Sequence, residues 1–155
     1  MQHQVLGHQS PISLNQKSGL LTRIMADLPN FLRPVFEKAC REWNWRQDDL
    51  PFDPQEISSW WGYNPTLKRQ DDVDLVAVSY DKKTIIGECK WCKAEKLSPQ
   101  ILDTLRSRAA LLSSKFGITK IHLYSFAKES CLSFKELAES QRVRLILFDD
   151  FWKSR

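Results

Sequence analysis

The sequence predicts an α/β fold in which helices pack against a single mixed sheet. Two observations lead to this prediction. Apolar residues recur at the helical period in residues 29–45 and 98–116, and short segments rich in Val and Ile recur between and after these helices. With 155 residues, 42% of them hydrophobic, the chain can build one ordinary domain with a real core.

The first half of the chain is predicted to contain one helix and three strands. The helix covers residues 29–45, where Pro34 fits only if it lies in the first turn. After a proline-containing loop comes a short aromatic strand around Ile57–Tyr63. Residues 73–80 and 84–91 are rich in β-branched side chains and are predicted to form a hairpin closed by the loop 81–83.

The second half is predicted to alternate helices and strands. The Ser98-Pro99 pair is typical of a helix start, and Gly117 is a plausible stop for that helix. The predicted order of elements over the whole chain is therefore α-β-β-β-α-β-α-β. Its last four elements are a helix at 98–116, a strand at 118–126, a short helix at 133–140 and a strand at 143–149.

Residues 1–28 are expected to be a loose arm or the remnant of a linker, and residues 29–155 are expected to form the domain. The net charge of +4 allows a polyanionic partner without requiring one. The sequence shows no secretory signal and no apolar run long enough for a membrane helix, so we expect a cytoplasmic protein with reduced thiols and no membrane partner.

Three charged residues stand out at one end of the predicted hairpin. If Tyr80 faces Thr84 across a three-residue loop, paired positions sum to 164, and Asp74 lies opposite Lys90 with Glu88 diagonal to Asp74. Two carboxylates beside a lysine suit a hard divalent cation such as Mg²⁺, with Mn²⁺ as a substitute. A surface ion pair of Lys90 with its neighbours is the alternative reading of the same residues.

The spacing of these residues resembles a known family signature. Asp74 followed by Glu88-Cys89-Lys90 is similar to the D…ExK pattern of the PD-(D/E)XK nuclease superfamily. The flanking segments 60–62 (WWG), 72–77 (DVDLVA) and 87–91 (GECKW) resemble the C-terminal nuclease-like domain of archaeal-type AAA+ ATPases. The resemblance covers residues 29–149 and implies a restriction-endonuclease-like α-β-β-β-α-β core.

The resemblance also implies roles for individual residues. Asp74 and Glu88 would bind the metal and Lys90 would position the attacking water, while Glu37 in the first helix would orient the site or bind metal. The implied activity is Mg²⁺-dependent endonuclease-type hydrolysis of DNA. No GxxxxGK[ST] loop is present, so an ATPase partner module would lie outside this chain. Two alternatives stay open: a non-catalytic nucleic-acid-binding or regulatory module of an ATPase, and an interaction domain that docks a partner through its tryptophans.

Basic and aromatic side chains near the hairpin are candidates for contacts with nucleic acid. Trp60, Trp61 and Tyr63 could stack on bases, although packing at the sheet edge is the simpler reading. The basic residues could line a phosphate track, or they could simply be the solvated face of a helix. They are Lys68, Arg69, Lys93, Lys96, Arg106 and Arg108.

Overall fold

The structure, a computed structural model, describes residues 11–153 of the chain, with side chains described from residue 18 onward. The chain divides into two parts, Met1–Leu32 and Arg33–Arg155. The sheet, its covering helices and all of the residues predicted to form the site belong to the second part.

The first helix, α1 (Pro11–Trp45), is longer than the sequence predicted. Residues 11–28 are helical rather than a loose arm, and residues 1–10 of the expected arm lie outside the described residues. The reason is intrinsic propensity, because this segment contains Leu, Lys, Arg, Met and Ala, which favour helix even where no core holds them. Within the described residues, no helix is long and apolar enough to span a bilayer.

Two prolines lie in the interior of α1, so the expectation that Pro34 occupies the first turn is wrong. Pro29 and Pro34 have no backbone N–H, and therefore neither can donate the usual helical hydrogen bond to the carbonyl four residues earlier. The division of the chain at Leu32 and Arg33 falls between these two prolines. Helix α1 therefore lacks two backbone hydrogen bonds close to the point in the sequence where the two parts divide.

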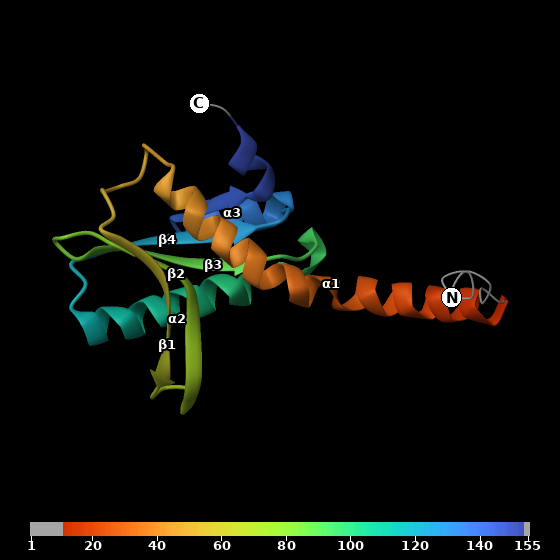
Figure 1. The fold of residues 1–155 in the computed structure, drawn as a ribbon. Helices are drawn as coiled ribbons and strands as arrows, with labels where there is room; N and C mark the ends of the chain where they lie inside the picture. Colours follow the sequence, from red (N-terminus) through yellow and green to blue (C-terminus); the bar gives the residue numbers. More distant parts are fainter. Residues whose placement is uncertain (1–10, 154–155) are drawn as a thin grey trace, which may run out of the picture. The chain divides into compact units, whose positions relative to one another are not determined.

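The five strands form one mixed sheet in sequence order, which confirms the predicted fold class (Figure 1). The first three strands pair antiparallel, and β3, β4 and β5 pair parallel. Their bounds are β1 (Glu56–Asn64), β2 (Arg69–Val78), β3 (Lys83–Lys90), β4 (Lys120–Ala127) and β5 (Val143–Leu147). The other helices are η2 (Ala94–Lys96), α2 (Pro99–Phe116), α3 (Leu132–Ser140) and η3 (Phe148–Trp152). As predicted, Gly117 ends α2 in the left-handed conformation, with φ of 62°.

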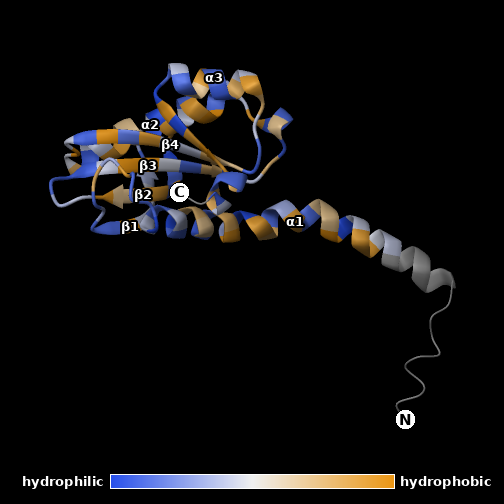
Figure 2. Cartoon of the chain, turned by 90° about the horizontal axis from the view of Figure 1, so that it is seen from above, coloured by the Kyte–Doolittle hydropathy of each residue, from blue (hydrophilic) through white to orange (hydrophobic). Residues whose placement is uncertain are grey.

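The sheet separates two apolar cores, one on each face. On one face the C-terminal part of α1 packs Phe36, Cys40 and Trp43 against the strands. On the other face α2 and α3 pack against the strands, with Leu105 and Phe134 among the buried contacts. Figure 2 shows the strands between these two helical layers. Because both faces are covered, the middle strands are buried along most of their length, at residues 73–77 of β2 and 84–89 of β3.

The register of the β2–β3 hairpin differs from the prediction by two residues. Val78 pairs with Thr84 and Leu75 with Gly87, so paired positions sum to 162 rather than 164. The loop has the expected three residues but starts one position earlier, at Tyr80. The cause is Lys82, which adopts the left-handed conformation (φ 61°) and lets the Ser79 N–H donate to the Lys83 carbonyl at 2.9 Å. An even shift keeps every side chain on its predicted face.

Gly62 lies directly beneath the ring of Trp60 in β1. A Cβ atom at position 62 would stand 2.5 Å from Trp60 Cζ2, which is too close for any real contact. Trp60 itself packs against the α2 side of the sheet, and Lys115 of α2 lies 5.3 Å from the centre of its ring. The Trp-Trp-Gly segment is therefore partly explained by packing of one tryptophan over a glycine.

We expect Gly62→Ala to destabilise the protein by about 1–3 kcal/mol, because the added methyl group must displace the Trp60 ring. Gly19→Ala is the matched control, since nothing lies within 4 Å of the position where its Cβ would be. That change removes a glycine from a helix and should be neutral or stabilising. Urea unfolding followed by tryptophan fluorescence measures both. An unchanged midpoint for Gly62→Ala would contradict the close packing of Trp60.

Candidate functional site

A β-bulge places Asp74 at the centre of the candidate site. Between two β1–β2 pairs, β2 advances three residues from Val73 to Val76 while β1 advances two, so β2 carries one extra residue. The Asp74 carbonyl accepts a 2.8 Å hydrogen bond from Arg41 Nη1 of α1, and Asp74 Oδ2 accepts one from the Cys89 N–H at 2.8 Å. The last β2–β3 pair is Leu75 with Gly87, so a carboxylate continues the ladder where the backbone pairing ends.

Glu88 lies in β3 and is held by two cations. Its carboxylate is almost completely buried, with 2% exposure for the residue. Lys90 Nζ lies 2.5 Å from Glu88 Oε1, and Arg108 Nη1 of α2 lies 2.6 Å from Glu88 Oε2. The alternating direction of side chains in β3 sends Glu88 and Lys90 to the same face, toward α2. Burial of this charge is tolerated because both oxygens are paired.

Arg108 joins Glu88 to a second buried acid. Its Nε and Nη2 atoms both donate to Asp71 Oδ1, at 3.1 and 2.8 Å. The other oxygen, Asp71 Oδ2, accepts from Asn64 Nδ2 at 3.0 Å. Although burial opposes the effect, hydrogen bonds from Arg108 and Asn64 lower the pKa of Asp71. Arg108 thus fixes β1, β2, β3 and α2 around one guanidinium group.

Helix α1 brings a further charged pair to the same place. Arg33 Nε donates to Glu37 Oε1 at 2.9 Å, one helical turn away. Arg33 Nη2 also lies 3.9 Å from Asp74 Oδ1 and 3.8 Å from Asp72 Oδ2. Asp72 Oδ1 in turn lies 3.9 Å from Arg108 Nη2. Asp72 therefore links the arginines contributed by α1 and α2.

The electrostatics show that Asp74, Glu88, Lys90 and Glu37 act on one another. Burial, followed by the negative charge of Glu88, raises the pKa of Asp74 to about 7. The charge of Glu37 also raises it, while the Cys89 hydrogen bond and Lys90 lower it. The structure brings together all four residues that the sequence singled out for catalysis.

Asp74 and Glu88 are of the residue type that binds a hard cation needing only one or two protein ligands. Mg²⁺ usually binds one or two protein carboxylates and keeps several waters, and Asp74 and Glu88 supply two carboxylates. No group of three or more His, Cys, Asp or Glu side chains with ligand geometry occurs among the described residues. Asp74 and Glu88 are thus the residues that could hold such a cation, and both oxygens of Glu88 are already paired with Lys90 and Arg108.

The six residues expected to contact nucleic acid are distributed over several places. Arg108 lies inside the acidic network rather than on an open track. Arg106 bonds Gln141, with 2.6 Å from its Nη2 to the Gln141 carbonyl, and is separate from the network. Lys68 lies in the turn before β2 and Arg69 begins that strand, while Lys93 precedes η2 and Lys96 ends it; all four are solvent-exposed.

The aromatic residues of β1 divide between packing and exposure. Trp60 packs against the core, as the simpler reading held. Trp61 and Tyr63 do not follow it, because they are 77% and 53% exposed. Alternation along the strand explains the split, since Trp60 faces the sheet's covered side and its two neighbours face away from it. Two of the three rings are therefore available to a partner.

Sequence reasoning missed Arg33, Asp71 and Asp72. Arg33 stands four residues before Glu37 within the helix predicted over residues 29–45, a spacing that signals a helical ion pair. The acids at positions 71 and 72 extend the acidic run that ends at Asp74. Their pairing with Arg108 could not be read from the sequence, because it depends on how α2 lies against the strands.

A family model matches residues 2–101, and its description is archaeal and bacterial proteins of unknown function. This range includes Glu37, Asp74, Glu88 and Lys90 but ends before Arg108. No curated protein and no solved structure gave a significant match.

Asp74→Asn should stabilise the metal-free protein at pH 8 by roughly 2–4 kcal/mol. The folded state holds a proton on Asp74 up to about pH 7, whereas the unfolded chain releases it near 3.8. The wild-type free energy of unfolding therefore carries a penalty that grows between these pH values, and the variant lacks it. Denaturant unfolding at pH 4 and pH 8 measures the difference, which should vanish at low pH. Asp72→Asn, at a half-exposed neighbour, is the control. A less stable Asp74→Asn at pH 8 would show that the carboxylate is a structural partner.

Arg108→Gln should destabilise the protein by about 3 kcal/mol, because it leaves the buried Glu88 and Asp71 carboxylates short of a cation. Arg106→Gln, two residues earlier on the same helix, removes an exposed arginine and should cost about 1 kcal/mol or less. Chemical denaturation of the two variants gives the comparison. Equal effects would contradict the linking role of Arg108.

Proposed function

The chain belongs to DUF234, a family of archaeal and bacterial proteins of unknown function, and from its site we propose that it hydrolyses phosphodiester bonds in DNA with Mg²⁺. The proposal takes the resemblance of its D…ExK residues to the PD-(D/E)XK nuclease superfamily as its starting point. The mixed sheet with helices on both faces is compatible with it. A fold alone does not establish an activity, so the argument rests on the site.

One observation carries the proposal: two buried carboxylates and a lysine meet where the β2–β3 ladder ends. Asp74 and Glu88 are each 2% exposed, and Lys90 Nζ is 2.5 Å from Glu88. Burying two acids so close together raises the pKa of Asp74 to about 7. A strongly raised carboxyl pKa is typical of functional sites. If the cluster served stability alone, replacing one of its acids with a neutral residue would make the folded protein more stable.

The side chains of this chain can perform the steps that hydrolysis requires. Asp74 and Glu88 would hold Mg²⁺, which would supply charge neutralisation at the phosphate and lower the pKa of a bound water. Lys90, one third exposed, can donate to a water or to a phosphate oxygen. Arg33, whose side chain is 53% exposed, can receive a phosphate beside Asp72. The exposed rings of Trp61 and Tyr63 offer surfaces on which bases stack.

A second candidate function is a non-catalytic nucleic-acid-binding or regulatory module. The observation in its favour is that both oxygens of Glu88 already have cationic partners, Lys90 and Arg108. These side chains neutralise Glu88 without a metal. An ATPase module outside this chain is the partner that this function would serve. Calorimetric titration with Mg²⁺ separates the two candidates, because only the nuclease requires a metal at Asp74 and Glu88.

We expect the purified protein to cut or nick DNA in the presence of Mg²⁺ or Mn²⁺. Supercoiled plasmid, linear duplex and branched DNA are the substrates, and a chelator should abolish cleavage. Lys90→Ala should lower the rate by about 100-fold or more, because it removes a donor to the water or the phosphate. Its affinity for DNA should change little, since one lysine contributes a small part of phosphate binding.

The matched control is Lys135→Ala, which removes an equal charge from an exposed position on α3, outside the network and outside the candidate nucleic-acid contacts. It should leave the cleavage rate nearly unchanged. If the wild type binds DNA in a gel shift at low salt but never cuts it with either metal, the binding module replaces the nuclease. If it neither binds nor cuts any of the three substrates, both functions are wrong and the interaction-domain reading is favoured.

A further inference from the structure

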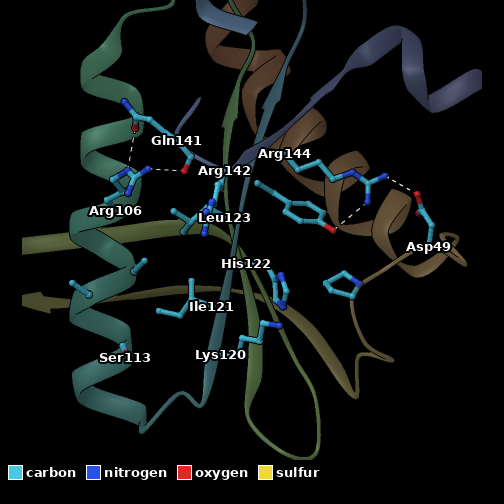
Figure 3. A pocket seen from close by; sticks show the side chains of 14 residues that line it. Asp49, Arg106, Ser113, Lys120, Ile121, His122, Leu123, Gln141, Arg142 and Arg144 are labelled. Atoms are coloured by element: carbon cyan, nitrogen blue, oxygen red, sulfur yellow. Dashed lines mark hydrogen bonds and ion pairs between the residues drawn. The ribbon is translucent and has the colours of Figure 1, made fainter. Parts of the chain in front are cut away.

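A hollow of about 810 Å³ lies on the second part of the chain, away from the acidic site. Figure 3 shows it between α2, the start of β4, the turn before β5 and the loop after α1. The β3–β4 register places Ile85 beside His122, and Glu88 beside Ser125. His122 in the hollow is thus about 10 Å along the strands from the level of Glu88. The volume is in the range typical of small-molecule sites.

The lining of this hollow is strongly cationic. Among the residues that the structure describes, Arg106, Lys120, Arg142 and Arg144 contribute four positive charges to the lining, and Asp49 is its single carboxylate. Asp49 Oδ2 lies 2.9 Å from Arg144 Nη2, so the negative charge of Asp49 mainly offsets the positive charge of Arg144 (Figure 3). Arg106 is held by uncharged groups, the side-chain and backbone oxygens of Gln141. Three of the four cations are therefore not neutralised by the lining carboxylate.

Other features of the hollow fit a compact molecule with an apolar or planar part. Its lining includes apolar side chains of α2 and β4, among them Ala109, Ile121 and Leu123, and the rings of His122 and Tyr124. The parallel strand β5 pairs with β4 only from Leu123 onward. The beginning of β4 is consequently an uncovered sheet edge that offers backbone hydrogen-bonding groups beside the cations.

The field in the hollow acts on His122. Burial, followed by the positive charges of Lys120 and Lys83, lowers the pKa of His122. An anion bound beside His122 would oppose these charges and move its pKa upward. The imidazole therefore offers a readout of occupancy that does not depend on any enzymatic activity.

We propose that this hollow binds a compact phosphorylated ligand of the size of a nucleoside phosphate. Its phosphate groups lie among Arg106, Lys120 and Arg142, where charge-assisted hydrogen bonds are available. The rest of the ligand lies against the apolar side chains of Ala109, Ile121 and Leu123. A small ligand is favoured over a nucleic-acid strand because the hollow of about 810 Å³ has the volume of a small-molecule site and combines cationic with apolar side chains.

The test is a titration of the full chain, without divalent metal and at low salt, with ADP and with inorganic pyrophosphate. Calorimetry gives the affinity, and NMR follows the imidazole signals of the three histidines. Binding should raise the pKa of His122. Arg142→Asn and Lys120→Gln should each weaken the affinity about tenfold, because each removes one charge-assisted contact.

The matched control is Lys68→Asn. Lys68 and Arg142 both adopt the left-handed conformation, with φ of 52° and 57°, and asparagine tolerates it well. Like Arg142→Asn, Lys68→Asn removes one positive charge from a residue in the left-handed conformation, but Lys68 lies outside the hollow. It should leave the affinity for ADP and pyrophosphate unchanged. Lys90→Ala should also leave it unchanged, which keeps this test separate from that of the proposed function.

Three results would overturn the proposal. The first is no binding of either probe at millimolar concentration. The second is binding that Arg142→Asn and Lys120→Gln weaken no more than Lys68→Asn does. The third is a single-stranded DNA oligonucleotide that binds and shifts the His122 pKa where ADP and pyrophosphate do not, because that would assign the hollow to nucleic-acid phosphates instead.

Discussion

The arrangement of the sheet end depends on keeping two buried acids, Asp74 and Glu88, in a nearly dry environment. The free energy needed to bury an unpaired charge is larger than the net stability of a typical domain. The buried acids therefore need cationic partners. They come from three separate elements: Arg33 from α1, Lys90 from β3 and Arg108 from α2. The bulge in β2 and the packing of both helices thus serve the same purpose, which is to place cations beside the buried carboxylates.

Much of the fold could be predicted because its signals are local. Apolar periodicity located α2 and the strands, and the Pro99 and Gly117 signals located the ends of α2 to within a residue. The grouping of Asp74, Glu88 and Lys90 also followed from local arithmetic. The assumed register was wrong by two residues, because the conformation of Lys82 moves the loop. The grouping survived since side-chain direction repeats every two residues.

The remaining parts of the site depend on contacts between segments far apart in sequence. Arg108 looked like one more basic residue on a helix, and only the packing of α2 brings its guanidinium against Asp71 and Glu88. The bulge at Asp74 leaves no mark in a run of acidic and apolar residues. The start of α1 was missed for a different reason, because propensity outweighed the polar composition of residues 11–28.

The separation of these segments along the chain has a consequence for the order of assembly. The β2–β3 hairpin brings Asp74 and Glu88 together through contacts close in sequence, which form early and quickly. The arginines arrive from positions 33 and 108, whose closure over long loops costs more entropy. Until both helices dock, the two acids must remain hydrated, so the hairpin end cannot dry before the helical layers are in place. From this we expect the charged cluster to form late in folding, after both helices have docked.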